Sequence, residues 1–137
     1  MCLEGRPVFF TTLPVVMVFV DFLGRVAEKH LFSTIYCFMP DHMHLIFMGR
    51  HDGADLLRGA EDFKQAGGFW LASHHPGVKW QRSFHDRIIR TLELPTKVRY
   101  VLDNPVREGL VDNWREYPFT GAIGLDLDVL LEELATY

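Results

Sequence analysis

The chain has 137 residues, of which 48% are hydrophobic and 23% are charged, and its formal net charge is −4. This length favours a single domain, and the hydrophobic content excludes disordered and collagen-like proteins. The acidic balance argues against a protein that coats duplex DNA through long-range attraction, but it leaves room for a local basic groove.

Neither the cysteines nor the apolar segments point to secretion or to a membrane. Cys2 and Cys37 form no disulfide framework and no CxxC pair, which favours a reducing compartment. The most apolar run, residues 15–23, contains Asp21 and is far shorter than the roughly 20 residues that a membrane span needs. A signal peptide is not recognisable. We therefore expect a soluble, cytoplasmic protein.

The first part of the chain predicts a helix followed by a β-hairpin. A threonine pair and a proline open residues 11–30, where apolar side chains recur every three or four positions, as on the buried face of a helix. Residues 32–39 and 42–48 are rich in aromatic and β-branched side chains. Pro40-Asp41 between them is a turn dipeptide, so the two runs are expected to pair as antiparallel strands.

A second helix and a further strand are predicted next. Residues 54–75 have helical periodicity with an irregular end at Gly67-Gly68, and Pro76-Gly77 then breaks the chain. Residues 78–89 are expected to form a strand with a polar insertion at residues 81–83.

The remaining chain predicts a third helix and an acidic end. Proline suits a first helical turn, and the apolar residues that follow share one face, so a helix is expected over Pro95–Asp103. Asn104-Pro105 is expected to interrupt this helix, and residues 106–109 to form a short turn closed by glycine. A loop then leads to residues 121–137, which are expected to form an acidic tail or helix.

This order of elements indicates an α+β fold with a mostly antiparallel sheet. A ferredoxin-like arrangement, also described as RRM-like or palm-like, fits the order, with the helices on one face of the sheet and one domain over residues 1–137. That arrangement needs one more strand before residue 11 than the chain offers. Its first strand is therefore expected to be missing or truncated.

A histidine pair stands at the start of the second hairpin strand. Side chains alternate along a strand, so His42 and His44 should project from one face while Met43 points to the other. Two nitrogen ligands at this spacing can share one divalent cation and leave positions open for water and a phosphate oxygen. A histidine pair near a turn is more often a polar surface feature, so the pair alone does not decide.

Tyr100 and Asn104 lie four residues apart on the third predicted helix and so share one of its faces. A tyrosine hydroxyl, with an unperturbed pKa of about 10, is a poor nucleophile unless its phosphate target is polarised and the hydroxyl is held. A neighbouring cation would polarise the phosphate, and Asn104 could offer a third ligand oxygen. The alternatives are a half-buried core tyrosine and an asparagine that caps the turn before Pro105.

Cationic and aromatic residues alternate between residues 79 and 90, a pattern suited to holding a phosphate chain while bases stack. An amphipathic strand with a solvated basic face is an equally good interpretation, and His85 could instead lie at the edge of the core. The residues that we predict to contact DNA are Lys64, Trp80, Arg82, His85, Arg87, Arg90, Lys97, Arg99 and Arg107.

The net charge is unevenly distributed. Residues 121–137 carry four acidic and no basic side chains, so they account for the whole −4. Residues 79–107 carry seven basic and three acidic side chains, a net charge of +4. The positive charge therefore collects on the segments that would meet DNA, which predicts weak and salt-sensitive binding rather than none.

Three segments together resemble a known enzyme family: residues 39–46 (MPDHMHLI), 80–86 (WQRSFHD) and 100–107 (YVLDNPVR). They are similar to the single-tyrosine transposases of the HUH (His-hydrophobe-His) endonucleases, and in particular to the REP-associated tyrosine transposases, which keep Asn-Pro-Val after the tyrosine. The similarity extends over residues 5–122 and rests on three motifs in the same order and spacing.

The resemblance implies a metal-dependent enzyme of DNA transposition. His42, His44 and Asn104 would bind Mg²⁺ or Mn²⁺, and Tyr100 would attack a phosphate of single-stranded DNA. The products would be a 5′-phosphotyrosine link and a free 3′-hydroxyl, which can reverse the reaction and join strands. The expected partner is a hairpin-bearing end of a mobile element, bound by a monomer or homodimer in the cytoplasm of a bacterial-type cell, at the nucleoid.

Two departures from the family leave another function open. The strand that normally precedes Arg6-Pro7 in the family is expected to be missing, which would expose a sheet edge to pairing with another chain. The second helix, basic in relatives, has three acidic and two basic residues over positions 55–64. The alternatives are a decayed or co-opted nucleic-acid-binding relative without transposase activity, and an unrelated α+β interaction protein.

Overall fold

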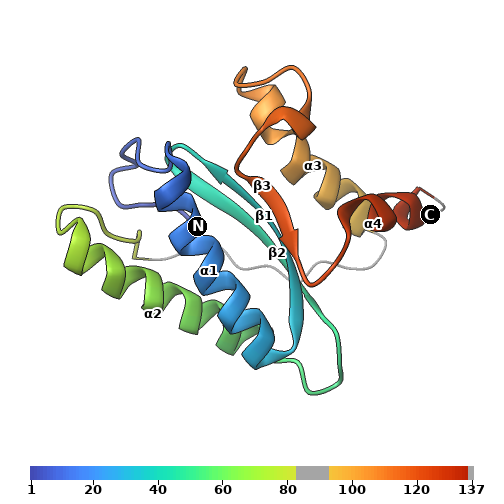
Figure 1. Ribbon diagram of the computed structural model, residues 1–137, viewed down its shortest axis with the longest axis horizontal. Coiled ribbons are helices and arrows are strands. Elements are labelled where there is room, and N and C mark those ends of the chain that lie inside the picture. The colour runs from blue at the N-terminus through green and yellow to red at the C-terminus, as the bar shows by residue number, and fades with distance from the viewer. Residues whose placement is uncertain (83–92, 136–137) are drawn as a thin grey trace.

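Figure 1 shows the computed structural model, which describes residues 1–82 and 93–135. Its elements are α1 (Leu13–His30), β1 (Phe32–Met39), β2 (His42–Gly49), α2 (Leu56–His74), α3 (Leu94–Arg107), the short 3-10 helix η2 (Trp114–Glu116), β3 (Thr120–Ile123) and α4 (Leu127–Leu134). The three strands form an antiparallel sheet in the order β2-β1-β3. The predicted α+β class, the first helix and the hairpin are confirmed.

The helices cover both faces of this sheet (Figure 1). Alternate residues of the central strand β1 point to opposite sides, as strand geometry requires. Phe32 and Phe38 pack with α1 and α2, whereas Ile35 and Cys37 pack with α3 and α4. The prediction that the helices share one face therefore holds for α1 and α2 and is wrong for α3 and α4. A strand buried on both faces is uniformly apolar, so its pattern does not reveal the second layer.

Helix α2 runs unbroken through the glycine pair at which the sequence suggested an irregular end. Gly67 is buried on this helix because two aromatic rings pack against its backbone. A Cβ atom added at Gly67 would lie 2.8 Å from Trp80 Cζ2 and 2.9 Å from Phe19 Cε1. The glycine therefore lets α2 approach α1 and residue 80 closely.

We expect Gly67→Ala to lower the free energy of unfolding, although alanine favours a helix by about 1 kcal/mol over glycine. Overpacking of this kind costs about 1–3 kcal/mol, so the clash should outweigh the helix propensity. Urea denaturation would measure the change. Gly24→Ala on α1 is the matched control, since no atom lies within 4 Å of its added Cβ, and it should stabilise the protein. Equal stabilisation by both variants would contradict the packing argument.

Helix α3 also continues where an interruption was predicted. Pro105 lies inside it, close to its end at Arg107. Proline removes one helical hydrogen bond, but the Asn104 carbonyl still accepts from the Glu108 N–H at 3.0 Å. Pro105 is itself buried, together with Val101, on the face that packs against the sheet. The proposed nucleophile and the residues after it thus share one continuous helix.

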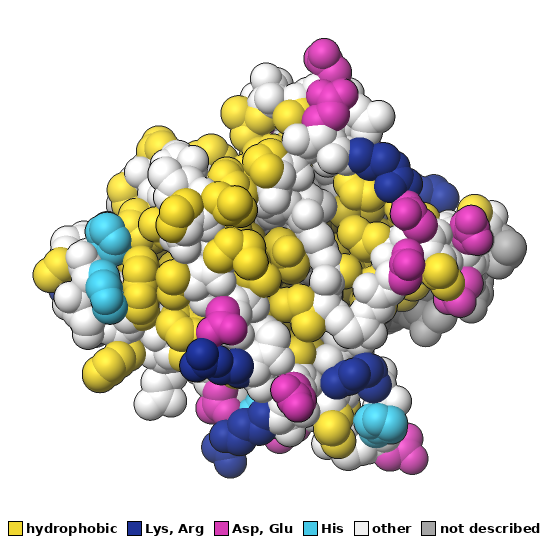
Figure 2. All heavy atoms as spheres, in the orientation of Figure 1, with side chains coloured by type: hydrophobic (Ala, Val, Ile, Leu, Met, Phe, Trp, Pro, Cys, Tyr) yellow, Lys and Arg dark blue, Asp and Glu magenta, His cyan; other side chains and the backbone are white. Residues whose placement is uncertain are grey.

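The third strand and the last helix complete the far side of the sheet. β3 pairs with β1, with Ile123 opposite Thr34, whereas the sequence suggested the end of a loop and the start of an acidic tail or helix here. The acidic end forms α4, capped by the Asp126 side chain and anchored by buried Leu134. Figure 2 shows acidic side chains at this end of the molecule, with others elsewhere on the same face, and the four acidic side chains of residues 121–135 are exposed. They are Asp126, Asp128, Glu132 and Glu133.

The sequence suggested an exposed sheet edge, but the edge of β2 is covered beside His42. Residues 1–3 lie against it, with a bridge between Cys2 and His42 and a hydrogen bond from the Met43 N–H to the Met1 carbonyl at 2.9 Å. Leu3 in turn forms a bridge with Trp80. These bridges cover the start of the β2 edge, so the expectation of an exposed edge is corrected for this stretch. Most of the strand predicted over residues 78–89 lies outside the described residues.

Within residues 1–82 and 93–135, no helix is both long enough and apolar enough to cross a lipid bilayer.

Candidate active site

The two histidines project from one face of β2, as the alternation predicts. His42 stands opposite Met39 and His44 opposite Cys37, and both of these β1 residues belong to the layer that packs against α3. Met43 points to the other face and is fully buried. The His42 Nε2 and His44 Nε2 atoms lie 3.2 Å apart. The hairpin register therefore aims both imidazoles toward the face that α3 covers.

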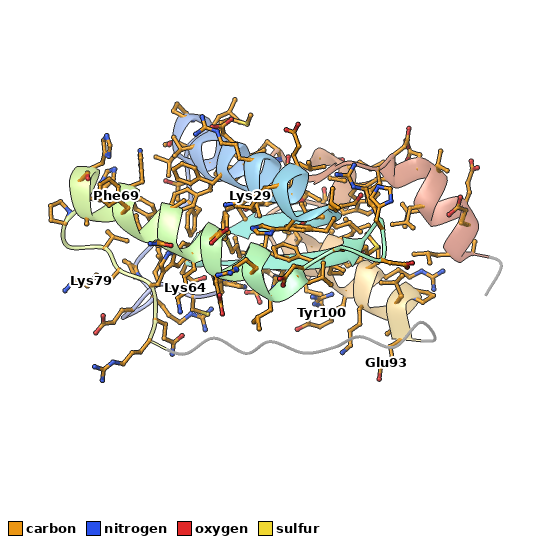
Figure 3. The ribbon with its side chains drawn as sticks, turned by 90° about the horizontal axis from the view of Figure 1, so that it is seen from below. Lys29, Lys64, Phe69, Lys79, Glu93 and Tyr100 are labelled. Atoms are coloured by element: carbon orange, nitrogen blue, oxygen red, sulfur yellow. The ribbon has the colours of Figure 1, made fainter. Side chains whose placement is uncertain are left out.

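Tyr100 comes to this pair from α3. Its ring lies 6.0 Å from the His44 ring, centroid to centroid, in an edge-on arrangement. Figure 3 shows its side chain on the side of α3 nearer the middle of the molecule. Tyr100 is 54% exposed, so a substrate can reach it. A strand and a helix that lie far apart in the sequence thus bring the predicted nucleophile beside the predicted cation ligands.

Asn104 lies one helical turn after Tyr100 and is only 5% exposed. Its Oδ1 accepts a long hydrogen bond of 3.3 Å from Arg107 Nη2, and its Nδ2 is the one buried side-chain N or O atom of the described residues that lacks a partner. Arg107 also donates to the Tyr100 carbonyl at 2.8 Å, and its guanidinium lies 4.0 Å from the centre of the Tyr100 ring. Arg107 therefore connects the two candidate residues of α3.

Burial keeps His44 in its neutral form. Desolvation first, and then the nearby charges of His42, the N-terminus, Arg107 and Arg6, together lower the pKa of His44 to about 4. A neutral imidazole carries the lone pair that a cation needs. The neutral form of His44 is the form that a cation ligand requires.

Sequence reasoning missed two residues at this site, Asp41 and Arg6. Asp41, which we interpreted only as a turn residue, places Oδ1 2.7 Å from His42 Nδ1 and Oδ2 3.1 Å from Arg6 Nε. Desolvation alone would raise the pKa of Asp41, but the hydrogen bond and charge of His42 and the charge of Arg6 outweigh it, so this pKa lies below its usual value. The position of Asp41 directly before the histidine was the only available signal.

The donor set fits a divalent cation. Two nitrogen ligands at about 2.0–2.2 Å from one cation are about 2.8–3.6 Å apart at octahedral or tetrahedral angles, and the histidine nitrogens are 3.2 Å apart. No three His, Cys, Asp or Glu side chains converge within the described residues, so a third protein ligand would be of another type. The atom of Asn104 that could bind a cation is its Oδ1, which accepts the long hydrogen bond from Arg107 here, whereas its unpartnered Nδ2 is a hydrogen-bond donor.

The predicted DNA contacts fall into three groups. Trp80 is committed to the core, because its ring packs on Gly67 and its Nε1 donates to the Lys64 carbonyl at 2.8 Å, so it is not free to stack on a base. The charged residues on or near the surface are Lys64, Arg82, Lys97, Arg99 and Arg107. The predicted contacts that lie outside the described residues are His85, Arg87 and Arg90.

No family model and no curated protein matches this chain. A solved structure, that of a REP-associated tyrosine transposase bound to a REP hairpin, has a similar fold, with a TM-score of 0.64 and 22% sequence identity over 79% of this chain. The match spans 65% of the length of the transposase chain. This likeness confirms the fold that the sequence motifs implied.

Proposed function

We propose that the protein cleaves and rejoins single-stranded DNA through Tyr100, with a divalent cation held by His42, His44 and Asn104. The observation that carries the proposal is the meeting of the histidine pair, 3.2 Å apart, with a tyrosine ring 6.0 Å from His44. If the two histidines were only polar surface residues, there would be no reason to expect an exposed tyrosine beside them on α3. The fold likeness to a tyrosine transposase supports the same assignment.

Each residue of the site has a distinct role in the proposed reaction. Mg²⁺ or Mn²⁺, when bound, supplies positive charge that polarises the scissile phosphate. The Tyr100 hydroxyl attacks phosphorus and loses its proton to solvent, the bond to the leaving 3′-oxygen breaks, and that oxygen takes up a proton. The chain then carries a 5′-phosphotyrosine. One phosphodiester replaces another of similar energy, so the reverse step can join strands without an external energy source.

The proposed substrate is single-stranded DNA next to a hairpin, as at the end of a mobile element. Support comes from the REP hairpin in the similar solved structure and from the basic side chains of α3, which lie on the same helix as Tyr100. Lys97 and Arg99 stand three residues and one residue before Tyr100 on this helix. Cationic side chains of this kind bind the phosphate backbone without regard to base sequence. The contacts should therefore weaken as salt is raised.

Removal of the cation tests this function directly. Incubation of the full chain with hairpin-bearing single-stranded DNA and Mn²⁺ should yield a covalent protein–DNA band on a denaturing gel. EDTA should abolish the band and an excess of Mn²⁺ should restore it, because the phosphate is no longer polarised without the cation. A band that persists in EDTA would contradict the cation site. Retarded DNA on a native gel without any covalent band under Mg²⁺ or Mn²⁺ would indicate a binding protein instead.

A further inference from the structure

The Asp41 carboxylate lies between an arginine and a histidine. Its Oδ2 pairs with Arg6 Nε at 3.1 Å, and its Oδ1 lies 2.7 Å from His42 Nδ1. Arg6 Nη2 also lies 3.2 Å from the same imidazole nitrogen, but a guanidinium can only donate, so this contact and the shorter one to Asp41 cannot both be hydrogen bonds of one tautomer; the shorter, charge-assisted contact to the carboxylate is the stronger of the two. Asp41 and Arg6 thus contact His42 at Nδ1, whereas His44 lies at the other ring nitrogen, Nε2.

The backbone of Arg6, whose side chain makes this contact, lies in an unfavourable conformation. Gly5 has φ +73° and Arg6 has φ +48°, in the left-handed region that residues with a Cβ atom rarely adopt. The segment is fixed further by hydrogen bonds from the Phe9 and Phe10 N–H groups to the Pro40 carbonyl at 2.7 and 2.9 Å. The chain after residue 6 is therefore tied to the turn that carries Asp41.

The contacts determine which nitrogen of His42 carries its proton. An ionised carboxylate can only accept hydrogen bonds, and the ion pair with Arg6 favours the ionised form. A distance of 2.7 Å between Asp41 Oδ1 and His42 Nδ1 therefore requires a proton on Nδ1. A neutral His42 then has its lone pair on Nε2, the atom that lies 3.2 Å from His44 Nε2.

We propose that Asp41 and Arg6 are positioning residues that hold His42 in the Nδ1–H tautomer, with Nε2 turned toward His44 as a cation ligand. The use of Nε2 by a cation rests on the proposed function, whereas the tautomer does not. Arg6 acts through Asp41: by holding Oδ2 it keeps the carboxylate from rotating away from the imidazole. Outer hydrogen-bond partners of this kind change metal affinity by about 10–100-fold when they are removed.

Asp41→Ala and Arg6→Gln test the proposal, with Asp21→Ala and Arg25→Gln as matched controls. The control pair forms an exposed ion pair on α1, 2.8 Å long, so it presents the same chemistry away from the site. Two-dimensional ¹H–¹⁵N spectra of the imidazole nitrogens would be recorded for the metal-free full chain at neutral pH. Isothermal titration with Mn²⁺ would give the dissociation constant. Backbone amide spectra would show that each variant is folded.

We expect the Nδ1–H pattern at His42 in the unmodified chain and in both controls. Asp41→Ala should shift His42 toward the Nε2–H form and weaken Mn²⁺ binding about 10–100-fold. Arg6→Gln, which leaves the turn residue in place, should shift both readouts in the same direction by a smaller amount. A merely structural role for Asp41 would not change the tautomer of a folded variant.

Two outcomes separate this proposal from the proposed function. If folded Asp41→Ala keeps the Nδ1–H pattern and the Mn²⁺ affinity of the unmodified chain, the positioning role is overturned. If the unmodified chain binds no Mn²⁺ while Asp41→Ala still changes the tautomer, the cation site is overturned and the tautomer control by Asp41 stands.

Discussion

Replacing Tyr100 by phenylalanine should lower the amount of covalent protein–DNA product by at least about a thousandfold, because the nucleophile is removed. Phenylalanine keeps the aromatic ring that Arg107 covers at 4.0 Å and that meets the His44 ring at 6.0 Å. Only the attacking oxygen is lost. The free energy of unfolding should therefore change by less than about 0.5 kcal/mol, as for most substitutions at exposed positions.

Tyr36→Phe is the matched control for this experiment. Tyr36 lies on β1, and its side chain packs with the layer of α1 and α2, on the face of the sheet opposite to the histidines. The control removes the same hydroxyl group from a place without a proposed role, so the covalent product should form at the normal rate. A covalent band of undiminished intensity from Tyr100→Phe would show that another residue is the nucleophile. Loss of the band in both variants would show that the effect is not specific to Tyr100.

The elements that the sequence predicted well are those whose pattern is local. The first helix and the hairpin have long, regular runs of apolar residues, and Pro40-Asp41 marks the turn between the strands. Because side chains alternate along a strand, the common direction of His42 and His44 follows from that hairpin alone. The histidine pair could therefore be predicted before any tertiary contact was known.

The elements that were mispredicted depend on contacts between distant residues. β3 has only four residues, among them Gly121, and its Cβ-free backbone fits against the Tyr36 ring on β1. No periodicity can be read from so short a strand. Pro105 suggested an interruption by its chemistry, but it lies near the end of α3 and is buried on the packed face, so tertiary packing outweighs the local preference.

The site itself could be predicted only in part, for the same reason. The roles proposed for the histidines, Tyr100 and Asn104 came from motifs, whereas the support of Asp41 by Arg6 depends on a left-handed turn 35 residues earlier in the chain. Trp80 shows the opposite error: its neighbours in the sequence suggested a base-stacking surface, but its ring fills the space above a helical glycine.

Substitution of His44 by alanine should remove both cation binding and cleavage. His44 supplies one of the two nitrogens that lie 3.2 Å apart, so its loss leaves a single imidazole and the Asn104 amide. We expect Mn²⁺ affinity to fall at least about 100-fold, because even outer-shell partners of a metal ligand contribute about 10–100-fold. The covalent product should disappear with it. Titration calorimetry and the gel assay would measure the two effects.

The low pKa of His44 sharpens the interpretation of this variant. With a pKa near 4, His44 is neutral at pH 7, so its replacement does not change the charge of the site. A loss of Mn²⁺ binding at neutral pH would therefore reflect a missing ligand rather than altered electrostatics. His51→Ala removes an exposed histidine beyond the end of β2 and should leave both readouts unchanged. Normal Mn²⁺ affinity in a folded His44→Ala variant would place any cation elsewhere and leave Tyr100 without its proposed partner.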